Sequence, residues 1–464
     1  MNLFWRRFIY IGFFIVFFII AFVLLFYLQG YRYDLNNRRL HQIGALMADS
    51  LPTKASLFLN DQLTSYQTPT TVQSLQPQDY QVKLDLAGFQ PWQKKLTVNP
   101  ALVTFTGQVR LWPNTQDSQL ISDGQINGAL LSPNKENLLY QIPSGLNSGL
   151  WLLNLSSGQT ALLKRQAGLI LKNLEWSPSS RYFLTEQNDN GKLSWQIYSL
   201  SDNTWQNINP PSDLKIKKLH WGDDEDLVFL ATDNELYSFD FGSGSKKLIW
   251  REVLSDFRVH DNLIFALTIR SNQTLALKAL NLSNLQVVLF DDPPALSSNV
   301  KFLPANQPRG WLPLFDLDRH TLYLLHSPLT ELTPIRRLPE VNSLDWSPDG
   351  QRLVLTNNFE IWDYTIEDNK LNLLLRLGSA FTLGRYFNQE PYLIVASGKE
   401  IWSLELDDRD KQQRWLLTEL NSEIQDIYLD PKGKNLVILT ADGLSRLTVD
   451  PNEPSDNRQL IRWP

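Results

Sequence analysis

The sequence predicts an all-β protein that carries one membrane helix at its N-terminus, and three observations lead to this fold class. An uncharged apolar run occupies residues 8–28, short strands of alternating polarity fill residues 44–113, and one hairpin pattern recurs within residues 114–464. Alternation with a period of two is typical of strands that bury one face. The chain of 464 residues is therefore divided into an anchor, a small β domain and a large repeat region.

The apolar run at residues 8–28 contains 21 residues without a charge and is rich in Phe, Ile, Val and Leu. At about 1.5 Å per residue, a helix of this length spans the roughly 30 Å hydrocarbon core of a bilayer. A cleaved secretory signal is the alternative, but the run is longer than the apolar region of a signal and no Ala-x-Ala cleavage site follows it. We therefore predict a retained single-pass transmembrane helix.

The flanks of this helix predict its orientation. Arg6 and Arg7 lie in a short tail, residues 1–7, but three arginines between residues 32 and 39 weaken the charge asymmetry that sets orientation. The short tail and the large body behind the helix favour an N-terminus inside the cell. We therefore expect a cell-membrane protein in which a juxtamembrane linker, residues 29–43, leads to an extracytoplasmic body.

The clearest copy of the repeated hairpin lies at residues 344–356 and reads Leu-Asp-Trp-Ser-Pro-Asp-Gly-Gln-Arg-Leu-Val-Leu-Thr. Its Pro presets φ and its Gly accepts a positive φ, so the strand that ends in Trp turns back into a second strand. Weaker copies share the strand end and the turn, and they lie at residues 130–134, 174–178, 219–223 and 428–433, with degenerate copies near 259–260, 302–303 and 386–388.

The spacing of the copies predicts the architecture. Trp176 and Trp346 are 170 residues apart, which is four steps of about 42.5, and Ser132 and Asp430 are 298 apart, or seven such steps. Steps of this length are typical of β-propeller blades. Eight blades are favoured for residues 114–464, and seven are also compatible. The Trp-Ser-Pro-Asp-Gly hairpin resembles the repeat of TolB-type propellers, whose blades carry four antiparallel strands around a central channel.

Closure of a propeller ring requires one strand to join the two ends of the repeat region. Residues 458–463 at the C-terminal end and residues 119–121 at the N-terminal end both carry a strand pattern, so either could close the ring. The chain has 15 Trp residues. We expect most of them, including Trp176 and Trp346, to be buried between blades, because large aromatic side chains dominate the packing of β-rich cores.

Residues 44–113 contain alternating strands at 55–59, 80–86 and 95–98, which predict a small β-sandwich. Short motifs accompany these strands: Ser50, Pro52 and Ala55, then Thr68-Pro69, Asp79-Tyr80, Gly88-Phe89 and Pro91-Trp92. In these positions the sequence resembles the PEGA family. The family signature runs from a Ser-x-Pro-x-x-Ala turn through a strand and a Thr-Pro to a Gly-Tyr and a final Trp.

The sequence departs from the family pattern in two places. The tetrapeptide that names the family, Pro-Glu-Gly-Ala, is Pro-Thr-Lys-Ala at residues 52–55, and Asp79 replaces the Gly that usually precedes the Tyr. Residues 30–34, Gly-Tyr-Arg-Tyr-Asp, resemble the juxtamembrane segment of bacterial membrane-anchored PEGA proteins with C-terminal propellers. The resemblance implies a cell-envelope protein whose PEGA module contacts surface polymers or proteins.

Composition excludes several classes of function. The net charge of −6, the pI near 5.5 and the lack of a long Lys/Arg run argue against a nucleic-acid partner. The sequence contains no Cys, which excludes disulfides, thiolate metal sites and a Cys nucleophile.

The histidines do not suggest a metal site. The five, His41, His220, His260, His320 and His326, form no His-Glu-x-x-His motif and no i, i+4 pair, so a zinc site lacks its ligands. His220 and His260 occupy corresponding places in successive hairpins, and we expect packing roles for both.

The other candidate motifs also lack their context. Residues 241–245, Phe-Gly-Ser-Gly-Ser, are a turn and not a Gly-x-Ser-x-Gly nucleophile elbow. The acidic clusters at 223–226 and 407–410 lack the ligand ladder of a calcium loop, and we expect them to be solvated loops between strands. No Gly-rich phosphate loop is present. We therefore predict no catalytic, cofactor-binding or metal-binding residues.

Two hypotheses of function follow. The first is a non-enzymatic envelope scaffold whose PEGA-like module and propeller bind a protein or an envelope glycan. The alternative is a propeller hydrolase or lyase that acts on an envelope polymer. Converging Asp or Glu with His or Arg in the channel would favour the enzyme, whereas aliphatic and Ser/Thr side chains would favour the scaffold.

Overall fold

The computed structural model describes residues 3–34, 39–114, 118–165, 172–189, 192–208, 214–270, 274–290, 294–303, 310–326, 332–333 and 335–450. The chain divides into two compact units. The first, here called the small unit, comprises residues 1–116, 404–417 and 449–464, and the second, the large unit, comprises residues 117–403 and 418–448. The small unit therefore includes a segment, residues 404–417, that lies far along the sequence from the rest.

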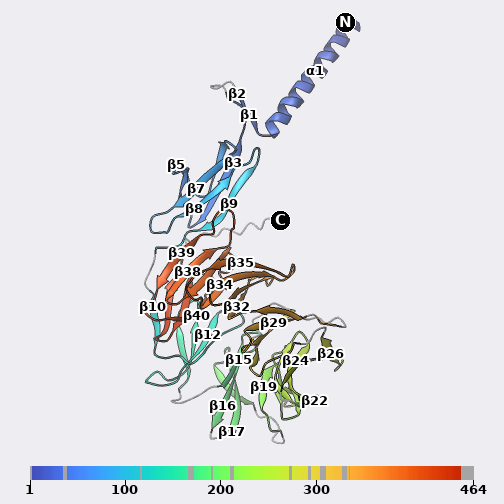
Figure 1. Ribbon diagram of the computed structural model, residues 1–464, viewed down its shortest axis with the longest axis vertical. Helices are drawn as coiled ribbons and strands as arrows, with labels where there is room; N and C mark the ends of the chain where they lie inside the picture. Colours follow the sequence, from blue (N-terminus) through green and yellow to red (C-terminus); the bar gives the residue numbers. More distant parts are fainter. Residues whose placement is uncertain are drawn as a thin grey trace. The chain divides into compact units, whose positions relative to one another are not determined.

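The small unit begins with the helix α1 (Leu3–Leu28), which precedes the strands β1 (Tyr31–Asp34) and β2 (Arg39–Gln42) (Figure 1). Its Phe8–Leu28 part is long and apolar enough to cross a membrane, and none of it is buried. A signal sequence has the same features. The strands β1 and β2 pair antiparallel, with Tyr33 opposite Leu40.

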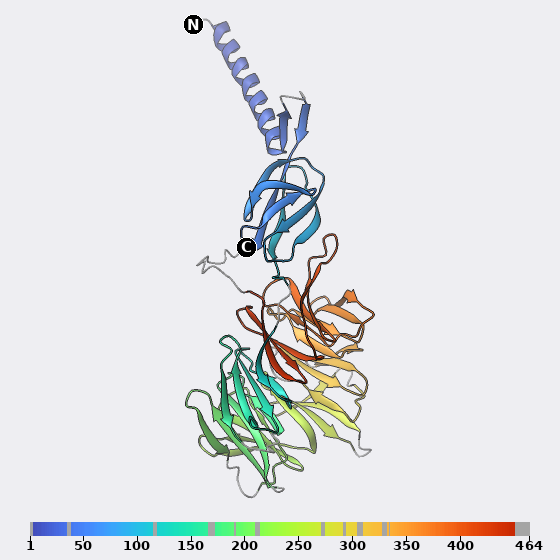
Figure 2. The same cartoon turned by 90° about the vertical axis from the view of Figure 1, so that its left-hand side faces the viewer.

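Two sheets form the body of the small unit (Figure 2). The three-stranded sheet has the order β6 (Thr70–Leu75), β3 (Gly44–Leu51), β9 (Val103–Arg110), and the four-stranded sheet has the order β5 (Gln62–Gln67), β4 (Ser56–Leu59), β7 (Asp79–Asp85), β8 (Trp92–Thr97). Side chains alternate between buried and exposed along β7 and β8, so each of these strands buries one face, as in a sandwich.

The PEGA-like turn residues form a buried hydrogen-bonded group. The hydroxyls of Ser50 and Thr68 are 2.5 Å apart, and the Thr68 hydroxyl also accepts a hydrogen bond from the Ala55 backbone N–H at 3.0 Å. Lys54, at the position of the family Gly, has a φ of 70°. The turn therefore keeps the left-handed conformation that Gly adopts freely, although the residue is Lys.

Within the described residues, the strands of the repeat region form eight sheets, each with at least four strands (Figure 1). The first four sheets are β11 (Ala129–Leu131), β12 (Asn137–Ile142), β13 (Gly149–Asn154), β14 (Thr160–Lys164); β15 (Lys172–Trp176), β16 (Tyr182–Asp189), β17 (Lys192–Ser199), β18 (Thr204–Ile208); β19 (Lys218–Trp221), β20 (Leu227–Ala231), β21 (Glu235–Asp240), β22 (Lys246–Arg251); and β23 (Leu254–His260), β24 (Leu263–Ile269), β25 (Leu275–Asn281), β26 (Val287–Phe290), with β30 (Leu332–Thr333) beside β26.

The other four sheets continue the pattern, in which strands that follow one another in the sequence lie side by side. They are β27 (Val300–Phe302), β28 (Trp311–Asp316), β29 (Thr321–His326), β31 (Ile335–Pro339); β32 (Ser343–Trp346), β33 (Arg352–Thr356), β34 (Glu360–Thr365), β35 (Lys370–Arg376); β36 (Leu383–Tyr386), β37 (Tyr392–Ser397), β38 (Glu400–Glu405), β39 (Arg414–Glu419); and β40 (Ile424–Leu429), β41 (Asn435–Thr440), β42 (Gly443–Thr448), β10 (Gln119–Asp123).

The repeated sequence motif is a tight hairpin between the first two strands of a sheet. In the clearest copy, the Ser347 N–H donates to the Arg352 carbonyl, and the Arg352 N–H donates to the Ser347 hydroxyl, both at 2.9 Å. Gly350, the fourth residue of the turn, has a positive φ, and Lys135 and Ser180 also have positive φ values in the weaker copies. The turns therefore share one backbone shape, although Gly occupies the left-handed position only in some of them.

Apolar clusters connect successive sheets. Trp176 and Trp346 are both 6% exposed, as expected, and Trp176 packs with Leu139 and Leu150 of the preceding sheet. A further cluster joins residues of the first sheet, such as Tyr140, to residues of the last, such as Val437. The apolar core therefore also links the last sheet to the first.

The N-terminal end of the repeat region supplies the outer strand of the last sheet. The strand β10 pairs antiparallel with β42, and Asp123 lies opposite Gly443. Of the two segments that could close the ring, residues 119–121 belong to this strand. The other segment, residues 458–463, lies outside the described residues.

Candidate functional site

A charged or titratable side chain lies just before the aromatic end of the first strands β15, β19, β27, β32 and β36. The hairpin aromatics fix the register between sheets, since Trp176 Nε1 donates to the Leu130 carbonyl at 3.1 Å and Trp221 Nε1 donates to the Glu175 carbonyl at 3.2 Å. The residue before the aromatic therefore lies beside its counterpart in the next sheet. Two groups of charged side chains result.

The first polar group joins the strands β15, β19 and β23. The His220 ring lies between two carboxylates, with Nδ1 at 2.7 Å from Glu175 Oε2 and Nε2 at 3.1 Å from Asp256 Oδ1. Arg258 lies against the same ring, and His220 is buried. On β23 it is therefore Asp256 and Arg258, and not His260, that contact His220. His220 is buried, and its ring also packs edge-on against Phe257, with centroids 4.8 Å apart, so it combines packing with polar contacts that the sequence did not predict.

Arg258 and His220 lower the pKa values of the two carboxylates in this group. Burial opposes ionisation of Glu175, but Arg258 and His220 together hold the pKa of Glu175 below its ordinary value. Burial also opposes ionisation of Asp256, and hydrogen bonding to His220 with the charges of His220 and Arg258 lowers the pKa of Asp256 well below its ordinary range. Both carboxylates are therefore kept as anions.

The second polar group joins β32, β36 and β40. The Arg385 guanidinium donates to Asp426 Oδ1 at 2.8 Å and to the Leu344 carbonyl at 3.0 Å, and Asp345 Oδ2 accepts a hydrogen bond from the Tyr386 N–H at 3.0 Å. Burial raises the pKa of Asp345, and the charges of Arg385 and Lys135 only partly oppose that rise. The group therefore holds two different carboxylates: Asp426 is paired with Arg385, whereas Asp345 is costly to ionise.

A cleft of about 680 Å³ opens beside the second polar group. The first strands of five sheets and the turns that follow them line it, so it collects residues from distant parts of the repeat region. Its wall mixes apolar side chains such as Phe315 with the amides of Asn134 and Gln389. A concave, mostly apolar wall with a few polar groups is typical of a binding site.

Two lysines of the cleft, Lys135 and Lys301, differ from its other charged residues. Both are exposed, and the described residues give neither ammonium group a hydrogen bond or an ion pair. Arg385, by contrast, is paired with Asp426. The cleft therefore presents two cations that are available to a ligand, in a protein whose net charge is −6.

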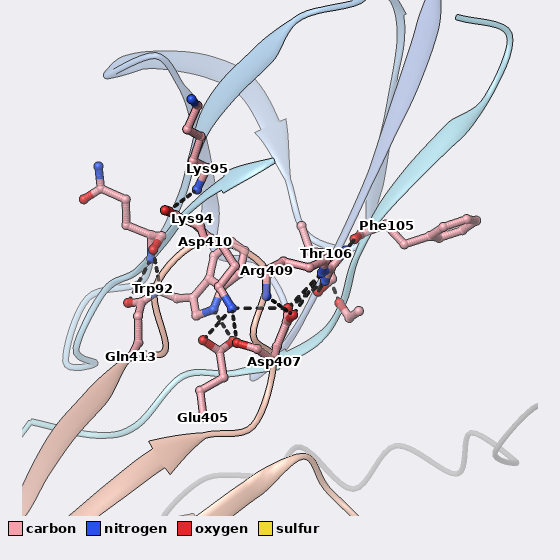
Figure 3. Close-up of polar contacts among 12 residues, drawn as sticks. Trp92, Lys94, Lys95, Phe105, Thr106, Glu405, Asp407, Arg409, Asp410 and Gln413 are labelled. Atoms are coloured by element: carbon pink, nitrogen blue, oxygen red, sulfur yellow. Dashed lines mark hydrogen bonds and ion pairs between the residues drawn. The ribbon is translucent and has the colours of Figure 1, made fainter. Parts of the chain in front are cut away.

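The small unit holds a separate charged cluster, in which the segment 404–417 contacts the PEGA-like strands (Figure 3). Lys94, on β8, has no exposed surface, and its Nζ lies 2.8 Å from Glu405 Oε2 and 3.2 Å from Asp407 Oδ2. Trp92 Nε1 donates to Glu405 Oε1 at 2.9 Å. The final Trp of the PEGA signature therefore binds a carboxylate that follows it by 313 residues.

Arg409 extends this cluster to the other sheet of the small unit (Figure 3). Its guanidinium donates to the Phe105 and Thr106 carbonyls at 2.8 and 3.2 Å and pairs with Asp407 at 2.7 Å. Burial opposes ionisation of Asp407, but the bonds from Arg409 and the charge of Lys94 hold the pKa of Asp407 below its ordinary value. Residues 408–410 are exposed in the loop between β38 and β39, as expected for a solvated loop, but Arg409 and Asp410 also bond the backbone of the PEGA-like strands.

The other sequence candidates do not form a site. His260 is buried, and burial lowers its pKa. Asp223 accepts a hydrogen bond from the Asn262 N–H at 2.8 Å, so part of the 223–226 cluster also makes a contact between sheets. Among the described residues, no three His, Asp or Glu side chains gather in a way that could hold a metal ion. The side chain of His41 lies outside the described part.

Asp345 and Arg385 were not predicted as site residues, although the sequence carries a signal for them. Each precedes the aromatic strand end in its copy of the hairpin, as Glu175 and His220 do in theirs. A comparison of that one position across the copies would have identified these four residues, but not Asp256, Arg258 and Asp426, which lie elsewhere on β23 and β40.

Comparisons with known proteins agree with part of this description. Residues 43–114 match the model of the PEGA domain, which confirms the resemblance of the small β domain. No curated protein matches the sequence.

Several solved structures are similar to this chain over part of its length. The Dos1 propeller has a TM-score of 0.49 at 14% identity, over 73% of this chain and 96% of its own. Sqt1 of Saccharomyces cerevisiae has a TM-score of 0.47 at 12% identity, over 73% of this chain and 99% of its own. The β-propeller domain of Cps50 (Swd1) from Myceliophteria thermophila has a TM-score of 0.41 at 11% identity, over 61% of this chain and 96% of its own.

Proposed function

We propose that the protein is a non-enzymatic binding scaffold of a bacterial cell envelope, anchored in the cell membrane by Phe8–Leu28 with its N-terminus inside. The eight sheets are the blades of one TolB-like propeller, and β10 closes the ring against β42. The pairing of these strands and the apolar cluster between the first and last sheets support this ring.

The cleft of about 680 Å³ is the observation that carries the proposal. It lies where five first strands meet, and in a propeller these strands line the central channel. Its apolar wall suits a segment of a protein partner, and Lys135 and Lys301 suit carboxylates on that segment. We therefore assign a protein segment with acidic side chains as the ligand. An uncharged envelope glycan is the alternative partner, and it would not depend on the two lysines.

Photo-cross-linking in cells tests this assignment. A photoreactive amino acid at Gln389, which lines the cleft, should capture a protein adduct in the full-length protein. The same amino acid at Lys247, an exposed residue of β22, is the matched control. Equal adducts at the two positions, or a glycan adduct at Gln389, would contradict a protein ligand in the cleft.

A specific observation also favours the enzyme alternative. The group of Glu175, His220 and Asp256 is the convergence of carboxylates with His and Arg that would suit a hydrolase or lyase. Against it, both imidazole nitrogens are already engaged by carboxylates, and both carboxylates are held as anions, so none of the three is a free acid or base. Incubation of the purified protein with envelope polymers tests the alternative, which requires product release that is lost in His220→Asn.

A further inference from the structure

The end of α1 is tied to a turn of the PEGA-like domain by a short series of backbone hydrogen bonds. The Ile43 N–H donates to the Gly30 carbonyl at 2.9 Å, and the Ala101 N–H donates to the Ile43 carbonyl at 2.8 Å. Gly30 is buried, has a φ of 81°, and a Cβ at this position would come within 2.8 Å of the Ala101 nitrogen. The backbone of the turn is therefore held directly against Gly30, two residues beyond the helix.

Large apolar side chains are exposed at this junction. Leu102, which follows Ala101 in the turn, is 59% exposed. Tyr33 and Leu40, which lie opposite each other in the β1–β2 hairpin, are also more than half exposed. Tyr33 lies three residues from Gly30, Leu40 three residues from Ile43, and Leu102 next to Ala101, so all three flank the hydrogen-bonded junction. Exposed apolar side chains near one junction indicate an interaction surface.

The position of the junction identifies what covers these side chains. The helix ends at Leu28, and the interfacial layer beyond the hydrocarbon core is about 5–7 Å deep on each side. A helix that spans the bilayer as far as Leu28 would place Gly30, and the turn bonded to it through Ile43, at this layer. Arg32 has its guanidinium 3.5 Å from the centre of the Tyr27 ring, and Arg and Tyr are the residue types that anchor helices there.

We propose that Leu102, Tyr33 and Leu40 form a membrane-contact surface that inserts into the headgroup layer of a phospholipid bilayer. The proposal rests on the proposed anchor at residues 8–28. It adds that the PEGA-like domain touches the membrane through its 99–102 turn and does not hang free on a linker. The contact would limit the orientations of this domain at the membrane surface.

The lack of native Cys allows a direct test. Leu102→Cys and Leu40→Cys each place a single thiol on the proposed surface, and Leu63→Cys is the control, because Leu63 is 65% exposed but lies on β5. Each full-length variant is labelled with the environment-sensitive dye NBD and reconstituted in phosphatidylcholine–phosphatidylglycerol liposomes. Flotation of the liposomes first shows whether the protein is anchored.

Lipids with a nitroxide near the headgroup should quench the dye at residues 102 and 40 at least about twofold more than at residue 63. Equal quenching at all three positions in floating protein would overturn the proposal and leave the anchor intact. A dye at residue 102 whose emission is blue-shifted without quenching by the lipid nitroxide would indicate that a second copy of the chain covers the surface. That result would also overturn the proposal. Failure to float would reject the anchor and the contact together.

Discussion

The lysines of the small unit and those of the cleft differ in their surroundings. Lys94 has no exposed surface, and its ammonium group contacts two carboxylates and a backbone carbonyl. Lys135 and Lys301 are exposed beside apolar side chains, and the described residues give neither ammonium group a hydrogen bond or an ion pair, although the charge of Lys135 acts on Asp345. The same side chain therefore occurs here as a fully paired structural charge and as an available one.

The difference separates charges that hold the fold from charges that can bind a ligand. A buried ion requires complete pairing, because desolvation without a partner costs several kcal/mol. An exposed lysine carries no such requirement, and its charge remains free to attract an acidic partner. Substitutions at Lys94 should therefore change stability, and substitutions at the cleft lysines should change binding.

The largest effect is expected for Lys94→Met. The substitution leaves the buried Glu405 carboxylate without its cation, and the loss of one partner of a buried pair costs about 3–5 kcal/mol. Urea unfolding, together with hydrogen exchange of residues 404–417, measures the loss. In Lys94→Met combined with Glu405→Gln, which keeps an acceptor for Trp92, much of the stability should return. A single-variant loss below about 1 kcal/mol would mean that the pair is not buried in solution.

The two buried tryptophans extend the comparison to neutral polar groups. Trp176→Ala and Trp346→Ala should each cost about 3–5 kcal/mol, because both side chains fill the core between sheets. Trp176 Nε1 has an acceptor, the Leu130 carbonyl, whereas Trp346 Nε1 has no hydrogen-bond partner among the described residues. Trp176→Phe should therefore cost about 1 kcal/mol more than Trp346→Phe in thermal melts. Equal costs would show that the Trp176 bond contributes nothing.

The pKa shifts of Glu175 and Asp345 have opposite signs and predict opposite pH dependences. The lowered pKa of Glu175 means that its pairing stabilises the fold above its ordinary value of 4.5 and that this contribution is lost as the pH falls below it. The raised pKa of Asp345 means that its ionisation destabilises the fold as the pH rises through that raised value. Melting temperature against pH measures both. At neutral pH, Glu175→Gln should lower the melting temperature more than Asp345→Asn does. The reverse order would contradict the signs of the two pKa shifts.

The smallest effect concerns Lys54, which occupies a left-handed position in the PEGA-like turn. A residue with a Cβ pays about 1 kcal/mol in this conformation, so Lys54→Gly should stabilise the small unit by up to that amount. Lys83→Gly is the control, since Lys83 lies in the interior of β7 and the substitution should destabilise. A lower melting temperature for Lys54→Gly would show that the Lys54 side chain makes a stabilising contact.

Local chemistry explains which features the sequence could predict. The Ser-Pro-Asp-Gly turn, the PEGA signature and the burial of Trp176 and Trp346 depend on residues close in sequence or on a regular repeat. The contact of Lys94 with Glu405 could not be predicted, because it joins segments about 300 residues apart and neither side chain belongs to a motif. The sequence also could not decide which segment closes the ring, because both ends of the repeat region carry a strand pattern.

The central claim is that the cleft lysines bind an acidic protein segment without supporting the fold. Lys135 has a φ of 61° at the turn position where Gly350 and Gly433 also occur, so Lys135→Gly keeps the turn while it removes the charge. Capture of envelope proteins by the full-length double variant Lys135→Gly, Lys301→Thr, compared with the control variant Lys247→Thr, Lys370→Thr, tests the claim directly. The expected result for the cleft variant is an unchanged melting temperature and loss of a partner that the wild type and the control retain. Retention of that partner by the cleft variant would contradict it.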